Sequence, residues 1–293
     1  MRSISRLICI AALICASTNM FSQYGFHFGF RAGLNFSNVS GPSELDNNGT
    51  ELENFKNGTG FHVGLTTRIG ITETFGVSAD LLYTQKGGKQ QFDGPGYFLY
   101  QTGDVPKVAT GPKTQSITLT NGYLELPLSL YYRPLKWLEL HAGAQASLLA
   151  NSRAQGELKF KGDNPVTAQM EVNLDYNYHK NGAYQPGTYA GKASTEINVD
   201  GRIVQVPNIL EAYYLYDEKP ADLYERFDWG LNAGANIYIS RSLFIGARYF
   251  WGLTDITNNK VDVSLGSINV NQLITRDDKD KNRTLQVTVG FVF

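Results

Sequence analysis

Residues 24–37, which read YGFHFGFRAGLNFS, alternate between two kinds of side chain at every step. The apolar set comprises Tyr24, Phe26, Phe28, Phe30, Ala32, Leu34 and Phe36. The small or polar set between them comprises Gly25, His27, Gly29, Arg31, Gly33, Asn35 and Ser37. Because successive side chains of a β-strand point to opposite sides, this period of two predicts a strand whose two faces differ in polarity.

The same alternation recurs along the chain and predicts an all-β protein. It gives eight strands, over residues 24–37, 60–69, 75–86, 123–133, 138–148, 227–239, 243–253 and 285–293. The composition agrees, because the 293 residues include 17 Tyr, 16 Phe and 30 Gly but only 3 Met, a usage typical of β-rich proteins. No apolar run in the sequence reaches the roughly 18 residues that a membrane-spanning helix needs.

The connections between the predicted strands alternate between short and long. Three are tight turns, and the four others span residues 38–58, 87–116, 150–225 and 255–282. Short turns at one rim and long loops at the other are typical of an outer-membrane barrel, whose short turns face the periplasm. We therefore predict an eight-stranded antiparallel transmembrane up-and-down barrel with long extracellular loops. A ten-stranded barrel stays open as the alternative, because residues 166–178 and 197–206 are also β-prone.

The polarity of the two strand faces indicates which face points outward. One face carries aliphatic and aromatic side chains, and the other mixes Gly, Ser, Thr, Asn and charged residues. Inside a narrow eight-stranded barrel, small residues make room for the long side chains beside them. The apolar face is therefore predicted to contact lipid and the polar face to line the lumen, which is the reverse of a water-soluble barrel.

The first 22 residues have the features of a cleaved secretory signal peptide. Two arginines precede the short apolar stretch Leu7–Ala16, and small and polar residues follow it. Both cysteines, Cys9 and Cys15, lie in this segment. The mature barrel domain, residues 23–293, is therefore predicted to contain neither a disulfide nor a cysteine that acts as nucleophile or metal ligand.

The charge of the chain excludes one class of partner. With 26 basic and 27 acidic residues, the formal net charge is −1. A nucleic-acid-binding protein needs a basic surface that neutralises phosphates. We therefore expect no nucleic-acid partner.

Four segments of the chain resemble sequences of a known family. They are FRAGLNFS (residues 30–37), YLELPL (123–128), GLTDI (252–256) and the terminal TVGFVF (288–293). On these segments the chain resembles the small outer-membrane β-barrel domain of Bacteroidota, often called PorT-like or porin family. The resemblance implies location in the outer membrane of a Gram-negative bacterium, contact with its lipid and insertion by the barrel assembly machinery, with Phe293 resembling the C-terminal assembly signal. Some members of this family are linked to secretion or gliding machinery.

The face predicted to line the lumen carries ions of both signs in nearly equal number. The basic residues are Arg31, Arg68, Lys86, Arg133 and Arg248, and the acidic residues are Asp80, Glu125, Glu139 and Asp228. A narrow lumen of low dielectric constant tolerates charges mainly when they are paired. We therefore predict that a structural charge network plugs the lumen, and its expected members are Arg31, Arg68, Asp80, Glu125, Arg133, Glu139 and Arg248. The alternative is a selective pore, although such a pore would show an excess of one sign.

The sequence predicts no enzyme and no cofactor. His62 and Thr66 form the only lumen pair of a base and a hydroxyl at the extracellular side, and both residue types are ordinary in a lumen. His27 and His141 are expected near each other at the periplasmic end. Two histidines without a carboxylate at fixed spacing are weak support for a metal site.

One segment imitates a calcium-binding loop. Asp278, Asp280 and Asn282 match the first ligand positions of such a loop. Arg283 stands where the sharp turn needs Gly, and the twelfth position is Val289 instead of Glu. We therefore expect a solvated loop of mixed charge and no metal.

The longest predicted loop carries a cluster of tyrosines. Tyr213, Tyr214, Tyr216 and Tyr224 form a candidate contact patch for an extracellular ligand or protein partner. Packing of the loop onto itself is the alternative. We predict a non-enzymatic outer-membrane protein whose extracellular loops bind a ligand or anchor a partner. Two other functions stay open, a small-solute pore and a component of a secretion or gliding-associated machinery.

Overall fold

The structure of the chain, a computed structural model, describes residues 25–100, 106–183, 192–269 and 272–293. The strands are β1 (Phe26–Ser40), β2 (Glu53–Gly70), β3 (Phe75–Tyr100), β4 (Lys107–Leu135), β5 (Leu138–Phe160), β6 (Met170–Asn177), β7 (Ser194–Val199), β8 (Arg202–Pro207), β9 (Ile209–Leu210), β10 (Phe227–Tyr238), β11 (Leu243–Gly252), β12 (Val263–Asn269), β13 (Gln272–Thr275) and β14 (Lys281–Val292). Within the described ranges, no helix has the length and hydropathy needed to cross a membrane. The predicted signal peptide, residues 1–22, lies outside the described residues.

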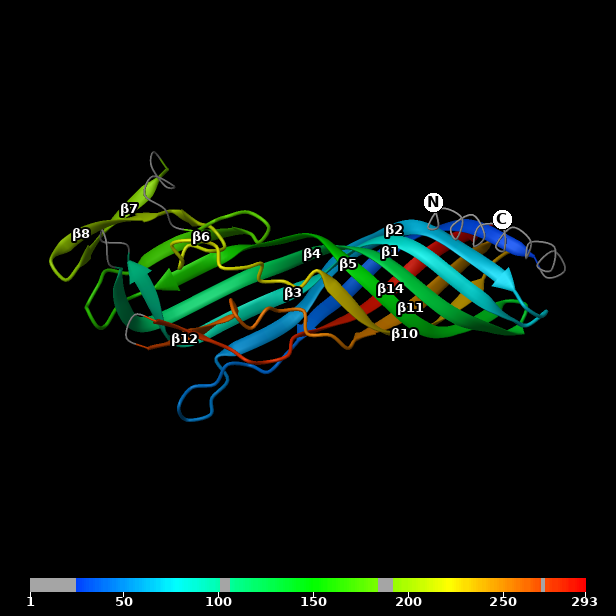
Figure 1. Cartoon of the computed structure of the whole chain (residues 1–293), viewed down its shortest axis with the longest axis horizontal. Coiled ribbons are helices and arrows are strands. Elements are labelled where there is room, and N and C mark those ends of the chain that lie inside the picture. The colour runs from blue at the N-terminus through cyan, green and yellow to red at the C-terminus, as the bar shows by residue number, and fades with distance from the viewer. Residues whose placement is uncertain (1–24, 101–105, 184–191, 270–271) are drawn as a thin grey trace, which may run out of the picture.

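Eight strands close into a barrel, which forms the right-hand part of Figure 1. They follow one another around the ring in the order β10, β11, β14, β1, β2, β3, β4, β5, and β5 pairs back with β10. Every pairing in this ring is antiparallel. The all-β barrel predicted from the alternation is therefore confirmed. The additional β-prone segments of the ten-stranded alternative lie outside the ring, because β6 pairs with β5 beyond it and β7 pairs with β8.

The polarity of the barrel wall is inside out. On β4, Leu126, Leu128 and Leu130 are 54%, 55% and 66% exposed. The residues between them point inward, and Glu125 and Ser129 are buried in the lumen. A protein surrounded by water would bury such leucines, so this wall faces hydrocarbon.

Aromatic side chains mark both edges of the apolar band. At the short-turn end, Phe75 and Tyr132 stack with ring centroids 4.6 Å apart, and Trp137 is 51% exposed. At the opposite end, Trp229 and Trp251 are exposed on the outer face. Aromatic rings of this kind prefer the interface between hydrocarbon and lipid headgroups, so the two girdles bound the membrane-spanning part.

Three strands continue far beyond the barrel and build a second body, on the left of Figure 1. β3, β4 and β5 contain 26, 29 and 23 residues, whereas a spanning strand needs about 9–11. We call the part beyond the ring the extension. It comprises the outer halves of these strands together with β6–β9, β12 and β13. Much of the segments 87–116 and 150–225, which the sequence analysis treats as loops, is therefore regular sheet.

The polarity of β4 reverses where the strand leaves the membrane. In the ring its outward residues are leucines, whereas beyond Asn121 its outward residues are Thr114, Ser116, Thr118 and Thr120. Its inward face gains the buried apolar residues Ile117 and Leu119 at the same point, beside the buried polar residues Lys113 and Gln115. Polar side chains now face water and apolar ones face a core, as in a soluble sheet. Because the outward residues of this part of β4 are polar, it lacks the outward apolar residues by which membrane-spanning strands are recognised in the sequence. The sequence therefore predicts a loop where the structure has sheet.

A bulge accompanies the same transition on β5. The register against β4 shifts between Gly122 and Tyr123, where Leu149 and Asn151 are successive partners and Ala150 is extra. The extra residue exchanges the two faces of the strand, as a bulge does. Beyond it, Ala154, Leu158 and Phe160 are buried, and the outward residues are Arg153, Gln155, Glu157 and Lys159.

Glycines inside the barrel leave room for lumen side chains. A Cβ at Gly290 would lie 2.1 Å from Cζ of Phe244, whose ring is fully buried. The guanidinium of Arg68 lies over the same ring at 4.7 Å. Gly290 therefore fixes the position of an aromatic ring and of the charge that rests on it.

We predict that Gly290→Val destabilises the barrel by about 1–3 kcal/mol or more, because the added methyl groups overlap the Phe244 ring. Unboiled gel mobility of the refolded protein should show a smaller compact fraction, and urea unfolding should occur at lower concentration. Val289→Leu, on the adjacent lipid-facing position that is 55% exposed, is the matched control. Equal folded fractions for the two variants would contradict this packing.

Candidate functional site

The middle of the lumen holds two arginines on one carboxylate. Nη1 of Arg31 lies 2.6 Å and Nη2 of Arg248 lies 2.7 Å from Oδ2 of Asp80. Thr66 donates a hydrogen bond to the other oxygen, Oδ1, at 2.6 Å. All four side chains are buried. Asp80 therefore joins β1, β2, β3 and β11 through charge-assisted hydrogen bonds.

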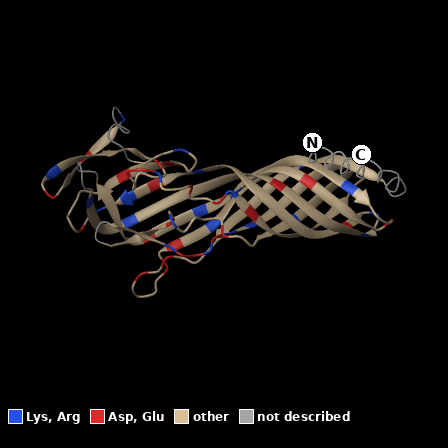
Figure 2. Ribbon diagram, in the orientation of Figure 1, with Lys and Arg blue, Asp and Glu red and all other residues tan. Residues whose placement is uncertain are grey.

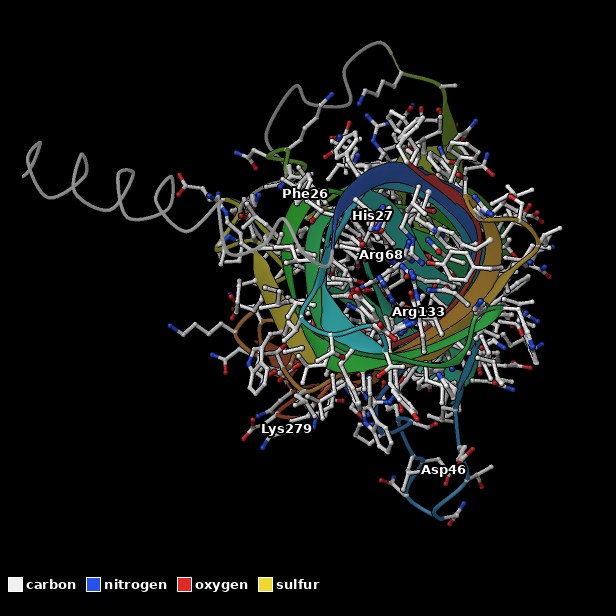
Figure 3. The ribbon with its side chains drawn as sticks, turned by 90° about the vertical axis from the view of Figure 1, so that its right-hand side faces the viewer. Phe26, His27, Asp46, Arg68, Arg133 and Lys279 are labelled. Carbon is white, nitrogen blue, oxygen red and sulfur yellow. The ribbon has the colours of Figure 1, made fainter. Side chains whose placement is uncertain are left out.

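A second cluster lies at the short-turn end of the lumen. The carboxylate of Glu139 accepts from Arg133 at 2.8 Å and lies 3.2 Å from Nη2 of Arg68. Tyr238 donates its hydroxyl to Glu139 at 3.1 Å. Arg68 and Arg133 are visible within the ring when the barrel is viewed along its axis from this end (Figure 3).

A third cluster closes the lumen toward the extension. Nζ of Lys86 lies 2.6 Å from Glu125 and 3.6 Å from Asp228. The same ammonium lies 3.8 Å from the centroid of the Phe250 ring, a cation–π contact. Asn282 donates to Asp228 at 2.9 Å. The side chains of Lys86, Glu125 and Asp228 have no exposed surface.

The structure brings all nine inward ions of the sequence analysis into these three clusters. Acidic and basic positions are interspersed along the barrel strands (Figure 2). Lys86 and Asp228 belong to the clusters, although the network expected from sequence did not include them. Because the clusters follow one another along the axis, side chains cross the lumen at three heights.

The histidines do not form a catalytic arrangement in the described part of the lumen. His62 donates from Nδ1 to Oδ1 of Asn35 at 2.7 Å and contacts the hydroxyl of Thr288 at 2.9 Å. Thr66 instead donates to Asp80, so His62 is not its base. The other two predicted histidines have different partners. His27 bonds the carbonyl oxygen of Phe293 at 2.8 Å, whereas His141 accepts from Arg248 at 3.4 Å.

Phe293 lies on the outer wall at the short-turn end. Its side chain is 65% exposed, and its ring makes edge contacts with Phe30 and Phe291. The residue is therefore accessible from the lipid side. Its role as an assembly signal stays a prediction.

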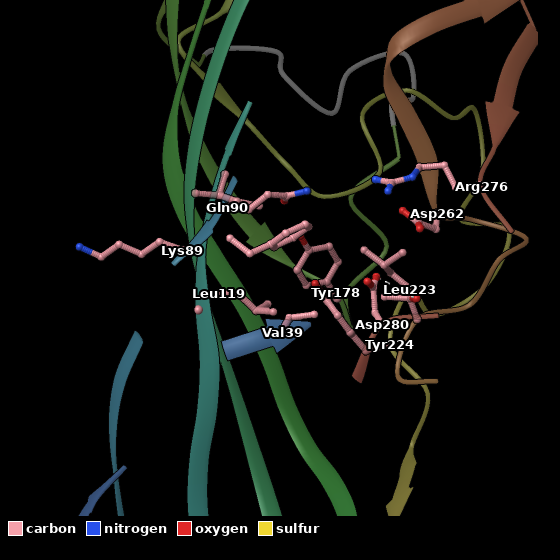
Figure 4. Close-up of a pocket in the computed structure, with 14 residues that line it drawn as sticks. Val39, Lys89, Gln90, Leu119, Tyr178, Leu223, Tyr224, Asp262, Arg276 and Asp280 are labelled. Atoms are coloured by element: carbon pink, nitrogen blue, oxygen red, sulfur yellow. Dashed lines mark hydrogen bonds between the residues drawn. The ribbon is translucent and has the colours of Figure 1, made fainter. Parts of the chain in front are cut away.

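The interior of the extension contains two adjacent voids of about 80 and 110 Å³, which we call the chamber. The residues that line both voids are Gln90, Ile117, Tyr178, Leu223, Asp262 and Arg276. Figure 4 shows residues from opposite sides of the first void, with Leu119 on one side and Asp262 and Arg276 on the other, while the Lys89 side chain points away. The chamber thus combines apolar, aromatic and charged side chains, as small-molecule sites do.

The four tyrosines of the candidate contact patch are not on the surface. Tyr213, Tyr214 and Tyr224 are 2%, 8% and 9% exposed, and Tyr216 packs against the same core. The hydroxyl of Tyr213 donates to the carbonyl of Tyr178 and accepts from the amide of Leu223, both at 3.0 Å. The surface patch is therefore corrected in favour of the packing alternative, because burial of the rings stabilises the loop. All four remain relevant as chamber walls.

Burial changes the acid–base properties of the chamber. It raises the pKa of Tyr213 and of Tyr216 to about 12 and lowers the pKa of Lys113 to about 8, against the attraction of Glu44. Burial, helped by the neighbouring Asp278, also raises the pKa of Asp262 to about 8. The tyrosines are therefore neutral hydrogen-bonding groups at neutral pH.

One group of carboxylates beside the chamber could hold a metal ion. Oxygen atoms of Asp262, Asp278 and Asp280 lie within 4.8 Å of one another. Arg276 lies between this group and Glu53, and it pairs with Asp278 at 2.5 Å and with Glu53 at 2.7 Å. The calcium-loop pattern of the sequence includes Asp278 and Asp280 but not Asp262, since no spacing rule connects residues of separate loop segments.

The family comparison finds one match over most of the chain. The model of the family described as outer membrane protein beta-barrel domain matches residues 21–258. Among curated proteins, none matches the chain.

The chain is also similar to solved outer-membrane barrels. Ail, the attachment invasion locus protein of Yersinia pestis, is 12% identical with a TM-score of 0.35, over 91% of this chain and 98% of Ail. OprG from Pseudomonas aeruginosa is 12% identical with a TM-score of 0.37, over 92% of this chain and 97% of OprG. Likeness at this level carries no argument about function.

We predict that Asp80→Asn lowers the free energy of unfolding by about 3–5 kcal/mol, because it leaves the charges of Arg31 and Arg248 buried without a carboxylate. Urea titration of the protein refolded into lipid vesicles measures this difference. The double variant Asp80→Asn/Arg248→Gln restores the net charge of the cluster, so it should recover part of the loss. Additive losses in the double variant would show that the two residues are not coupled.

Proposed function

Since the chain belongs to the outer membrane protein β-barrel domain family, we propose that it is a non-enzymatic binding protein that its closed barrel anchors in the membrane. The family places the chain in the outer membrane of a Gram-negative bacterium. The observation that carries the proposal is the combination of a lumen crossed by three ion-pair clusters with a chamber in the extension.

The lumen argues for an anchor instead of a pore. A passage through the barrel would have to separate the pairs around Asp80, Glu125 and Glu139, all of which are buried. Breaking one buried pair costs about 3–5 kcal/mol. Asp80 and Glu139 are each shared between two arginines, which raises this cost. Opening the lumen would therefore require a large input of free energy.

The chamber argues for a small polar ligand. Its walls supply aromatic rings for apolar contact, and hydrogen-bonding groups such as Gln90, Gln115 and the hydroxyl of Tyr216. A few polar groups in a mostly apolar cavity give orientation and specificity. The strands that form the chamber are continuous with the barrel, so the walls are supported by the rigid ring.

Three finer features belong to the same proposal. Residues 1–22 direct export and are removed, and Phe293 is read by the barrel assembly machinery during insertion. The resemblance to the PorT-like family of Bacteroidota supports both statements and leaves room for a protein partner in a secretion or gliding machinery. Mass spectrometry of the mature protein tests the cleavage directly.

We predict that the purified protein gives no steady conductance in planar lipid bilayers, because paired side chains cross its lumen. The gel shift between boiled and unboiled samples is the control that the inserted protein is folded. Sustained single-channel steps from folded protein would contradict the anchor and favour the small-solute pore.

We predict that a small polar ligand raises the melting temperature of the detergent-solubilised protein, and that Gln115→Leu weakens its binding by up to about tenfold. The change removes a hydrogen-bonding group, which contributes about 0.5–1.5 kcal/mol, from a chamber wall where Gln115 is 5% exposed. The probes are a panel of monosaccharides, disaccharides, amino acids and nucleosides.

The matched control is Gln155→Leu, on the outward face of β5. It makes the same chemical change outside the chamber and should leave binding intact. Equal losses in the two variants, or no shift with any probe in the panel, would remove the chamber as the binding site.

A further inference from the structure

Two segments that are distant in the sequence place three carboxylates together at the junction between barrel and extension. Asp262 immediately precedes β12, whereas Asp278 and Asp280 precede β14. One oxygen of each lies within 4.8 Å of the others. Figure 4 shows Asp262 and Asp280 on the same side of the void, with Arg276 beside Asp262.

The nearby positive charge does not balance these carboxylates. Arg276 already pairs with both Glu53 and Asp278. Across the described ranges, neither Asp262 nor Asp280 takes part in an ion pair. One cation cannot neutralise four carboxyl groups, so full ionisation of this cluster in a partly closed space is unfavourable without a further counter-ion.

Unsatisfied oxygens are a second and independent observation. Oδ2 of Asp262, Oδ1 of Asp278 and Oδ1 of Asp280 are buried and have no hydrogen-bond partner among the described residues. Asp280 is 8% exposed, and its other oxygen, Oδ2, accepts from the hydroxyl of Thr257 at 3.2 Å. Buried carboxylate oxygens are normally paired or bound to a metal, so each of these atoms indicates a missing partner.

The ligand atoms that the three aspartates offer indicate which kind of cation would bind. All three groups offer oxygen, and no thiolate or imidazole is among them. Hard cations prefer such ligands, and calcium accepts irregular arrangements with waters completing its shell, whereas magnesium requires a near-ideal octahedron. We propose that Asp262, Asp278 and Asp280 form a calcium site that fastens residues 255–282 to the top of the barrel.

Such a site would stabilise a wall of the chamber. The residues that follow Asp262 along β12 include Val263 and Leu265, which line the second void. Asp280 is also tied to the preceding segment, because its amide donates to Asp255 at 3.1 Å and its carbonyl accepts from Ile256 at 2.9 Å. A cation at this point would join the two ends of residues 255–280. The site does not depend on whether the chamber binds a ligand.

Terbium luminescence tests the proposal, because Tb³⁺ replaces calcium and is excited by nearby tyrosines such as Tyr178 and Tyr224, which line the same void. The refolded wild-type protein in metal-free buffer should show saturable terbium emission that calcium displaces. Asp262→Asn and Asp280→Asn should each weaken calcium binding by about tenfold or more, since affinity follows the number of charged ligands. The gel shift on boiling establishes that each variant is folded.

The control is Asp277→Asn, which removes the same charge from an exposed position in the same segment. Its calcium affinity should stay within about twofold of wild type, because exposed charges interact weakly at physiological salt. Absence of displaceable terbium emission in the wild type would overturn the site. Equal losses in Asp277→Asn and Asp262→Asn would also overturn it, because the effect would then be general electrostatic attraction.

Discussion

Closure of the backbone hydrogen bonds around the ring is the constraint on which the rest of the structure depends. In hydrocarbon, an unpaired amide or carbonyl costs several kcal/mol, so an open sheet edge cannot exist there. The pairing of β5 with β10, from Phe227 against Leu148 to Ile237 against Leu138, removes the last edge. An eight-stranded ring is narrow, and its narrow lumen then decides which side chains fit inside.

Closure of the ring removes inward charges from bulk water, and ion pairs inside the lumen compensate for this loss of solvation. Inward positions are shielded from bulk water on all sides, so each charge there needs a partner of opposite sign. Asp80 and Glu139 each serve two arginines, while Lys86 serves two carboxylates. These shared partners connect strands that are not neighbours in the ring. The same pairs that hold the barrel together therefore fill the space that a pore would need, and occlusion follows from stability.

The sequence predicts the barrel well because period two and inward ions are both local signals. Tyr24–Ser37 already shows two faces, and the inward set contained every ion of the three lumen clusters. The extension was not predicted as sheet, because β4 and β5 exchange the polarity of their faces near Asn121 and Ala150. Alternation persists beyond these points, but the rule that the apolar face is the outer one fails where lipid gives way to water. The convergence of Asp262 with Asp278 could not be predicted for another reason, since it depends on how two irregular segments that are distant in the sequence come together in space.

Continuity of the strands decides how the two bodies are coupled. β3 and β4 remain paired from Phe75 against Tyr132 in the ring to Tyr100 against Lys107 at the far end of the extension. A paired sheet of this length has no linker between the membrane-spanning part and the chamber, so rigid-body motion of one against the other would break ladder hydrogen bonds. The irregular stretches 211–226, 253–262 and 276–280 are different, because they lie outside the strand ladders. We therefore expect adjustment of the chamber to a ligand in the irregular residues that line it, which include residues 213–216 and the stretch that ends with the unsatisfied carboxylate of Asp262.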